Sequence, residues 1–206
     1  PALGDIDDDG LVEIVTLTPQ GAFVVFENDG TLKWTTPTTW GSGQQSQPLD
    51  YSSAVAIANL DNAGLPEIIV ANQIIDANGG APLVLPETSG QWSATTAADM
   101  DGDGDLEVVL GHAVYHHDGT LAWNSGLPAG YPQVADMDGD MLPEVVLTNT
   151  SGLALIEHDG TVTYSGLTPT GNPPGFTTWL RPATIHDFDG DGEPCLLYTS
   201  DAADES

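Results

Sequence analysis

A short acidic pattern, Asp-x-Asp-x-Asp-Gly-x-x-Glu, recurs along this chain of 206 residues and limits what it can fold into. Copies that keep the pattern, or nearly keep it, begin at Asp5, Asp99 and Asp136. The copy at Asn59 lacks a carboxylate at its fifth position, and the copy at Asp187 stops matching before its ninth. A motif that returns at intervals of this length indicates a fold built from repeated units.

The spacing of the carboxylates is typical of a calcium-binding loop. Ca²⁺ takes six to eight oxygen ligands at about 2.3 to 2.6 Å, and alternate carboxylates on a tight loop supply them. Positions one, three and five would contribute side-chain oxygens, position seven a backbone carbonyl, and the Glu at position nine a closing carboxylate. The candidate ligands are Asp5, Asp7, Asp9, Leu11 and Glu13; Asn59, Asp61 and Glu67; Asp99, Asp101, Asp103, Asp105 and Glu107; Asp136, Asp138, Asp140, Leu142 and Glu144; and Asp187, Asp189, Asp191 and Glu193.

The segments around the loops predict strands and not helices. An EF-hand closes with Glu at position twelve and continues into a helix, whereas position twelve is Thr16, Leu110 or Leu147 here. The residues after the closing Glu read "IVTLT", "VVLGH" and "VVLTN". Such β-branched runs favour strands, because a stiff branched side chain packs well on a pleated sheet. Each loop is therefore expected to join two strands.

A second repeated signature predicts further strands in each unit. It reads "VVFENDGTLKW", "AVYHHDGTLAW" and "LALIEHDGTVTY". Its Asp-Gly dipeptides, at 29–30, 118–119 and 159–160, accept positive φ, so primed hairpin turns are expected. The loop starts are 54, 40, 37 and 51 residues apart, which suits one four-stranded antiparallel blade per loop. The sequence thus predicts an all-β fold, a partial β-propeller of about four to five blades.

The two signatures together resemble the FG-GAP or VCBS repeats of integrin-like bacterial propellers. The resemblance covers residues 1–194 and rests on "VADMDGD" followed by "PEVVL", and on "HDGTVTY". It implies that the acidic loop lies between the first two strands of a blade and binds calcium through the Asp and Glu residues of the first, third and fourth loops. The chain departs from the family pattern at Ala63, which removes an oxygen, and at Met141, where other loops carry glycine.

The last residues do not follow the repeat. The segment "CLLYTSDAADE", which begins at Cys195, resembles the translation of a sequencing adaptor, and Cys195 stands where a closing Glu is expected. We therefore assign residues 1–194 to the propeller repeats and residues 195–206 to a non-native tail. Because Pro1 lies only a few residues before the first loop, we expect an internal fragment of a longer protein.

The negative charge of the chain is concentrated in the loops. Only Lys33 and Arg181 oppose 31 acidic residues, and 20 of the 31 lie inside the five loop segments, which disfavours a uniformly acidic surface as the main cause. The net charge of −29 makes nucleic acid and anionic membranes unsuitable partners. No apolar run is long enough to cross a bilayer. Because such loops fill at near-millimolar Ca²⁺, an extracellular, cell-surface or periplasmic location is expected.

Several aromatic and imidazole side chains have two interpretations. His112, His116 and His117 could hold a transition metal, but alternate residues of a strand point to opposite faces, so ordinary strand and turn positions are favoured. One group of aromatic residues ends the Asp-Gly hairpins and is expected to pack between blades, and a second group lies in longer connections and could contact a ligand. The first group is Trp34, Trp123 and Tyr164, and the second is Trp40, Trp92 and Trp179.

The sequence contains no familiar catalytic constellation. A Gly-x-Ser-x-Gly elbow, a phosphate-binding Gly-rich loop and a cysteine outside the tail are all missing. A calcium-stabilised propeller that binds a protein or carbohydrate ligand, as an adhesion module of a secreted or cell-surface protein, is the favoured hypothesis. The alternative is part of a propeller-scaffold enzyme, such as a polysaccharide lyase or a quinone-dependent dehydrogenase. A lyase needs cations to neutralise an acidic sugar, and only Lys33 and Arg181 are available.

Overall fold

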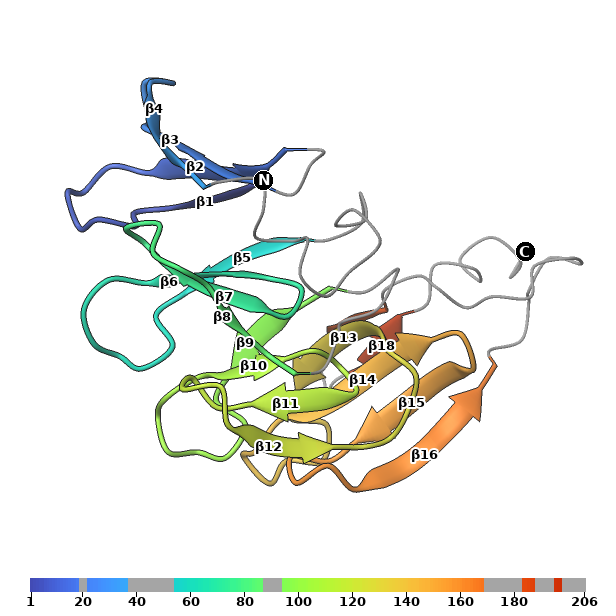
Figure 1. Ribbon diagram of the computed structural model, residues 1–206. Helices are drawn as coiled ribbons and strands as arrows, with labels where there is room; N and C mark the ends of the chain where they lie inside the picture. Colours follow the sequence, from blue (N-terminus) through green and yellow to red (C-terminus); the bar gives the residue numbers. More distant parts are fainter. Residues whose placement is uncertain (19–21, 37–53, 87–93, 169–182, 188–194, 198–206) are drawn as a thin grey trace, which may run out of the picture.

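The chain folds into a row of small antiparallel sheets, which we call blades one to five (Figure 1). Four blades have four strands each, connected as a simple meander, and the fifth has two. The structure is a computed structural model and describes residues 1–18, 22–36, 54–86, 94–168, 183–187 and 195–197. Within these residues every regular element is a strand and the sheets do not close into a ring. The predicted all-β, propeller-type fold is confirmed.

The strands of each blade follow one another in chain order. Blade one contains β1 (Ala2–Gly4), β2 (Glu13–Leu17), β3 (Phe23–Phe26) and β4 (Leu32–Thr35); blade two contains β5 (Val55–Ala58), β6 (Glu67–Val70), β7 (Gln73–Asp76) and β8 (Leu83–Val84). Blade three contains β9 (Thr96–Ala98), β10 (Glu107–Val109), β11 (Ala113–Tyr115) and β12 (Leu121–Asn124); blade four contains β13 (Gly130–Ala135), β14 (Glu144–Asn149), β15 (Gly152–Ile156) and β16 (Val162–Leu167). Blade five contains β17 (Thr184–His186) and β18 (Cys195–Leu197).

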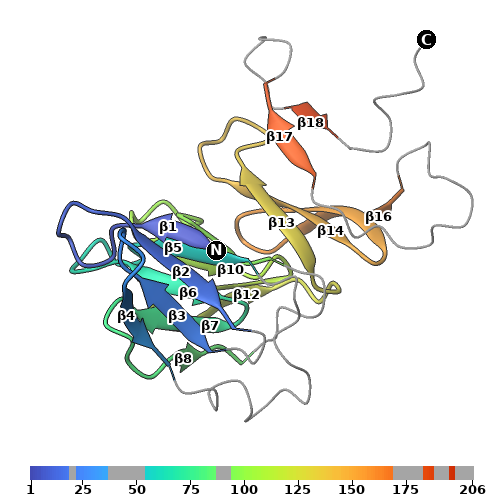
Figure 2. The same cartoon turned by 90° about the horizontal axis from the view of Figure 1, so that it is seen from above.

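The blades stack face to face, with their first strands on one side of the stack. Figure 2 shows β1 beside β5 and β13 beside β17, and both pairs are in contact. Stacking buries both faces of the second strands β6, β10 and β14. In β6, Ile68 and Val70 pack with blade one, while Ile69 between them packs with blade three. Since successive side chains of a strand point to opposite faces, a strand between two blades must be apolar throughout. This explains the continuous apolar runs after each acidic loop.

Three apolar clusters hold the four complete blades together, one cluster at each junction. The first contains Phe23 of blade one and Ile75 of blade two. Each cluster also contains the residue at position two of an acidic loop, namely Ile6, Leu60 and Met100, and each of these is at most 1% exposed. Burying such a side chain contributes about 1.5 to 3 kcal/mol. The acidic loops are therefore anchored in the junctions between blades.

The outer hairpins have a different turn type from the expected primed turns. The glycines of the three Asp-Gly dipeptides have φ between 83° and 87°, but the preceding Asp residues do not have positive φ. In blade one the N–H of Gly30 donates to the carbonyl of Glu27 (2.9 Å), and the N–H of Glu27 donates to the carbonyl of Thr31 (2.8 Å). This is a type I turn followed by a left-handed glycine and a bulge. Asp29 accepts the N–H of Thr31, which favours the type I turn.

Blade two has the same turn in a form that the sequence interpretation missed. Its turn runs from Asp76 to Gly79, where the N–H of Gly79 donates to the carbonyl of Asp76 (2.9 Å) and Gly79 has a φ of 75°. Here Asn78 precedes the glycine in place of Asp. Both dipeptides signal a hairpin turn, so a search that included Asn-Gly would have found it.

Outer-strand tryptophans link blade one to blade two and blade three to blade four, as predicted. Trp34 donates from Nε1 to the carbonyl of Ala77 in the turn of blade two (2.9 Å), and Trp123 donates to the carbonyl of His158 in the turn of blade four (2.7 Å). The candidates for ligand contact, Trp40, Trp92 and Trp179, lie outside the described residues.

The proposed domain boundary after residue 194 falls inside blade five. β18 pairs with β17 through Ile185 and Leu196, in the register of the first two strands of a blade. The assignment of residues 195–206 to a non-native tail stays a prediction, and residues 198–206 lie outside the described part of the chain.

Candidate metal centres

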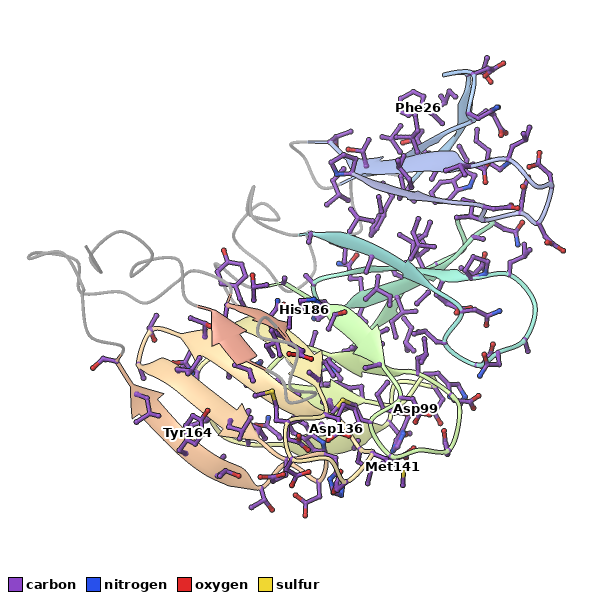
Figure 3. The ribbon with its side chains drawn as sticks, turned by 180° about the vertical axis from the view of Figure 1, so that it is seen from behind. Phe26, Asp99, Asp136, Met141, Tyr164 and His186 are labelled. Atoms are coloured by element: carbon purple, nitrogen blue, oxygen red, sulfur yellow. The ribbon has the colours of Figure 1, made fainter. Side chains whose placement is uncertain are left out.

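The acidic loops connect the first two strands of the blades and follow one another along one side of the stack. The loop of blade two touches that of blade three, because the side-chain amide of Asn62 donates to the carbonyl of Gly104. Figure 3 shows Asp99 and Asp136, which begin the third and fourth loops, near one another on this side. Ordered loops of similar shape therefore line one rim of the molecule.

The Asp at position one organises the first, third and fourth loops. In the third loop Asp99 accepts the N–H of Gly102 on one oxygen (2.7 Å) and the N–H of Gly104 on the other (3.1 Å). Asp5 and Asp136 accept the equivalent pairs of N–H groups in the first and fourth loops. These bonds wrap the backbone around the carboxylate and bring the later acidic positions close to it.

Positions four and six of the loops have left-handed backbone conformations. Position four includes Asp8 (φ 62°) and position six includes Gly10 (φ 85°) and Gly104 (φ 98°). Met141 occupies position six of the fourth loop with a φ of 76°, so it adopts the glycine conformation and leaves the loop intact. The cost of a left-handed L-residue is about 1 to 2 kcal/mol.

The closing glutamates are tied to their loops through one oxygen. Glu13 and Glu144 are 0% and 1% exposed. In each loop Oε2 accepts the N–H of the residue at position two: Glu13 from Ile6 (2.9 Å), Glu67 from Leu60 (2.9 Å), Glu107 from Met100 (2.8 Å) and Glu144 from Met137 (2.6 Å). The same hydrogen bond in four blades fixes the position of the closing carboxylate relative to its loop.

The second oxygens of two of these glutamates are buried without a hydrogen-bond partner. They are Oε1 of Glu13 and Oε1 of Glu144, and Oδ1 of Asp7 is in the same condition. A buried polar group that lacks a partner costs about 1 to 3 kcal/mol, and a charged group costs more. A cation in the loop would supply the missing partner, so the side chains present fit a bound metal ion.

Ligand atoms converge in the loops that the sequence marks as most complete. Four groups each have their atoms within 4.8 Å of one another: Asp5, Asp7 and Glu13; Asp99, Asp101 and Asp103; Asp101, Glu107 and His116; and Asp136, Asp138 and Glu144. In the second loop the N–H of Ala63 donates to Asn59 and Asp61. The carbonyls at position seven stay predictions, and Asp189, Asp191 and Glu193 lie outside the described residues.

Burial and the repulsion of neighbouring carboxylates disfavour the ionised form of Glu67, Glu107 and Glu144. Burial is the main cause that raises the pKa of Glu67, Glu107 and Glu144 above the ordinary value. The neighbouring carboxylate of Asp138 raises the pKa of Glu144 further. A divalent ion would reverse both effects, because it stabilises the charged form.

The sequence interpretation missed one further residue beside each loop, namely the first residue of the neighbouring hairpin turn. This position carries Glu27, Asp76, His116 and Glu157 in blades one to four. Asp76 pairs directly across from Glu67, and Glu157 is close enough to raise the pKa of Glu144. In the sequence this position can be recognised because it lies three residues before the turn glycine.

In blade one this position forms an ion pair that reaches the metal loop. Nζ of Lys33 lies 2.6 Å from Oδ2 of Asp7 and 2.9 Å from Oε1 of Glu27. The lysine lowers the pKa of Asp7, and the two carboxylates raise the pKa of Lys33. One oxygen of the first loop is thus already neutralised by the protein itself.

Together, the meander blades and their acidic loops define a repeat protein of the propeller class. The profile of the FG-GAP-like repeat family matches residues 5–70 and 136–197, and the chain belongs to this family. No curated protein matches the chain. The described residues contain no helix of the length and apolarity needed to cross a membrane.

Several solved structures share the fold. The Vibrio cholerae biofilm matrix protein Bap1 matches with a TM-score of 0.60 and 28% identity, over 80% of this chain and 27% of Bap1. The rhamnogalacturonan lyase YesX matches with a TM-score of 0.57 and 21% identity, over 80% of this chain and 38% of YesX. The Bacillus licheniformis rhamnogalacturonan lyase PL11 matches with a TM-score of 0.58 and 20% identity, over 80% and 39%. The chain thus spans less than half the length of each.

Proposed function

We propose that this chain is part of a calcium-stabilised β-propeller that serves as a binding or adhesion module of a secreted or cell-surface protein. The observation that carries the proposal is the pair of buried, unpartnered oxygens on Glu13 and Glu144, two residues that each belong to a group of converging carboxylates. A hard cation would satisfy these oxygens and fix three chain segments of a blade, namely two strands and the loop between them.

The ligand chemistry of the first and fourth loops favours Ca²⁺. Their converging groups offer only carboxylate oxygens, which suit Ca²⁺, Mg²⁺ and Mn²⁺ better than softer ions. Ca²⁺ tolerates irregular geometry and six to eight oxygens, whereas Mg²⁺ demands a near-ideal octahedron and retains water. An irregular loop with several carboxylates fits the former better.

A binding role agrees with the small number of cationic side chains among the described residues. Lys33 is the single Lys or Arg among them, and its charge is already engaged in ion pairs with Asp7 and Glu27. A lyase that acts on acidic sugars needs cationic groups to stabilise the developing charge. The likeness to lyases concerns the fold, while Bap1 is a biofilm matrix protein. We therefore infer a carbohydrate or protein ligand, outside the cytoplasm.

The test of the metal proposal is thermal unfolding in excess Ca²⁺, in excess Mg²⁺ and in chelator. A ligand that binds only the folded state stabilises it by about 2.7 kcal/mol per site at 100 times its dissociation constant. We expect a clear rise of Tm with Ca²⁺, which Asp138→Asn reduces. Asp159→Asn, in a hairpin turn outside the loops, serves as the matched control and should keep the full calcium response. Identical melting curves in calcium and chelator would refute the proposal.

The test of the binding role separates the two function classes. The protein, with and without Ca²⁺, is incubated with extracellular polysaccharides and with rhamnogalacturonan. Retention without chain cleavage supports a binding module, whereas release of unsaturated sugar products would show the lyase alternative to be right.

A further inference from the structure

The third loop differs from the others because an imidazole takes the place of a carboxylate. The first residue of the outer turn is Glu27, Asp76 or Glu157 in the other complete blades and His116 in blade three. Nδ1 of His116 lies 3.2 Å from Oε1 of Glu107. That oxygen is equivalent to the unpartnered Oε1 of Glu13 and of Glu144. In blade three a nitrogen therefore reaches the point where the first and fourth loops leave a buried oxygen without a partner.

The nitrogen belongs to a converging group of three ligands. A ring nitrogen of His116 and one oxygen each of Asp101 and Glu107 lie within 4.8 Å of one another. Glu107 is almost fully buried and His116 is about one-third exposed, so the group has a rigid base and an opening to solvent. Asp101 also belongs to the group with Asp99 and Asp103, which lies directly beside it.

We propose that the Asp101–Glu107–His116 group is a transition-metal site that takes Zn²⁺ or a similar borderline divalent ion. Imidazole suits Zn²⁺, whereas hard cations such as Ca²⁺ are bound through oxygen. One nitrogen and two carboxylates make three protein ligands, which is the number that Zn²⁺ commonly takes when a fourth position is left to water or to another ligand. Nδ1 would be the ligating atom, with the imidazole proton on Nε2.

This inference rests on the proposal that the loops bind cations, but not on calcium being the ion in every loop. It assigns different ions to different blades of one propeller. His117 supplies the internal comparison, because its Nδ1 lies 3.6 Å from Asp105 and outside the converging group.

The experiment is calorimetric titration of Zn²⁺ into the chain with excess Ca²⁺ present, together with Co²⁺ absorption as a spectroscopic readout of the nitrogen ligand. Even loss of a group that only orients a ligand costs about 10- to 100-fold in metal affinity, so His116→Gln should lower Zn²⁺ affinity at least about tenfold. His116→Glu, which restores the residue type of blades one and four, should lose Zn²⁺ and gain a calcium site. His117→Gln should leave Zn²⁺ affinity unchanged.

The results distinguish the two proposals. A wild-type chain that shows no Zn²⁺ site in excess Ca²⁺, or a His116→Gln variant that binds Zn²⁺ as the wild type does, overturns the transition-metal site even if Ca²⁺ raises Tm. Zn²⁺ binding that depends on His116, without any effect of Ca²⁺ on Tm, would instead refute the calcium proposal alone. Melting curves in chelator establish that each variant is folded, and the lack of a Zn²⁺ site in the wild-type chain overturns the proposal without any variant.

Discussion

Met141 shows how a loop tolerates a residue that the repeat pattern does not favour. Its side chain is 88% exposed, so the cost of its φ of 76° is a backbone cost and not a packing one. Glycine adopts this conformation freely but loses more entropy on folding. We expect Met141→Gly to stabilise the protein by about 0.5 to 1 kcal/mol, measured by denaturant unfolding.

The reciprocal change in the third loop is the control. Gly104 has a φ of 98° and open space around the position of a Cβ, so Gly104→Met should destabilise by a similar amount. A stabilising Gly104→Met would mean that the left-handed conformation is not what limits these positions.

Glu144 gives a prediction whose sign depends on the metal. Its folded-state pKa is raised above the ordinary value of 4.5, so the folded state binds more protons than the unfolded state just above that pH. Without a cation, stability should therefore fall as pH rises from about 4.5 through the raised pKa. Glu144→Gln removes this effect, and in chelator at pH 7 the variant should be more stable than the wild type by about 1 kcal/mol.

With excess calcium the order should reverse, because the variant loses a ligand. The measurement is chemical unfolding of both proteins from pH 4 to pH 7, in chelator and in calcium. In chelator the advantage of the variant should vanish below the ordinary carboxyl pKa. A variant that is less stable in both conditions at pH 7 would show that the buried oxygen is not strained by the lack of a partner.

At the scale of the hairpin, two glycines separate backbone strain from contact between blades. Gly30 and Gly160 occupy the same turn position with φ of 85° and 87°. A Cβ on Gly30 would meet nothing within 4 Å, whereas a Cβ on Gly160 would lie 2.8 Å from the ring of Trp123. Gly30→Ala should cost about 1 kcal/mol, and Gly160→Ala should cost about 1 to 3 kcal/mol more. Equal losses of Tm would show that Trp123 moves aside freely.

The strands and loops could be predicted because their signals are local. Alternating carboxylates, β-branched runs and Asp-Gly dipeptides act within a few residues, so they predicted the elements and the positions of the loops. The turn type was wrong, since Asp-Gly fits both a primed turn and a type I turn with a left-handed glycine. The roles of His116 and Lys33 depend on how adjacent strands pair, and that pairing brings His116 to Glu107, nine residues before it, and Lys33 to Asp7, 26 residues before it. Local patterns carry no information on it.

At the scale of the whole molecule, the three separate apolar clusters predict limited cooperativity. Blades contact mainly their neighbours, so stability is a sum of blade and junction contributions. Ile69 is fully buried in the middle junction, and Ile69→Ala should cost about 2 to 5 kcal/mol. Hydrogen exchange should then show blades one and two opening separately from blades three and four.

The control for this substitution is Leu121→Ala in an outer strand. Leu121 is half exposed and lies in none of the three clusters, so its loss should change stability by less than about 0.5 kcal/mol. Uniform loss of exchange protection across all four blades in Ile69→Ala would contradict the separate junctions.

The contact between an outer strand and a turn glycine has a fixed direction. Trp34 covers Gly79, Leu83 covers Gly119, and Trp123 covers Gly160, so each blade covers the turn of the blade that follows it and never the reverse. The stack consequently has a polarity: blades one to three present a covering side chain to the blade that follows, and blades two to four present a turn glycine to the blade before. A whole blade can be duplicated or deleted in evolution without creating a new kind of junction. A blade stacked in the opposite orientation would bring two turn glycines, or two covering side chains, against each other.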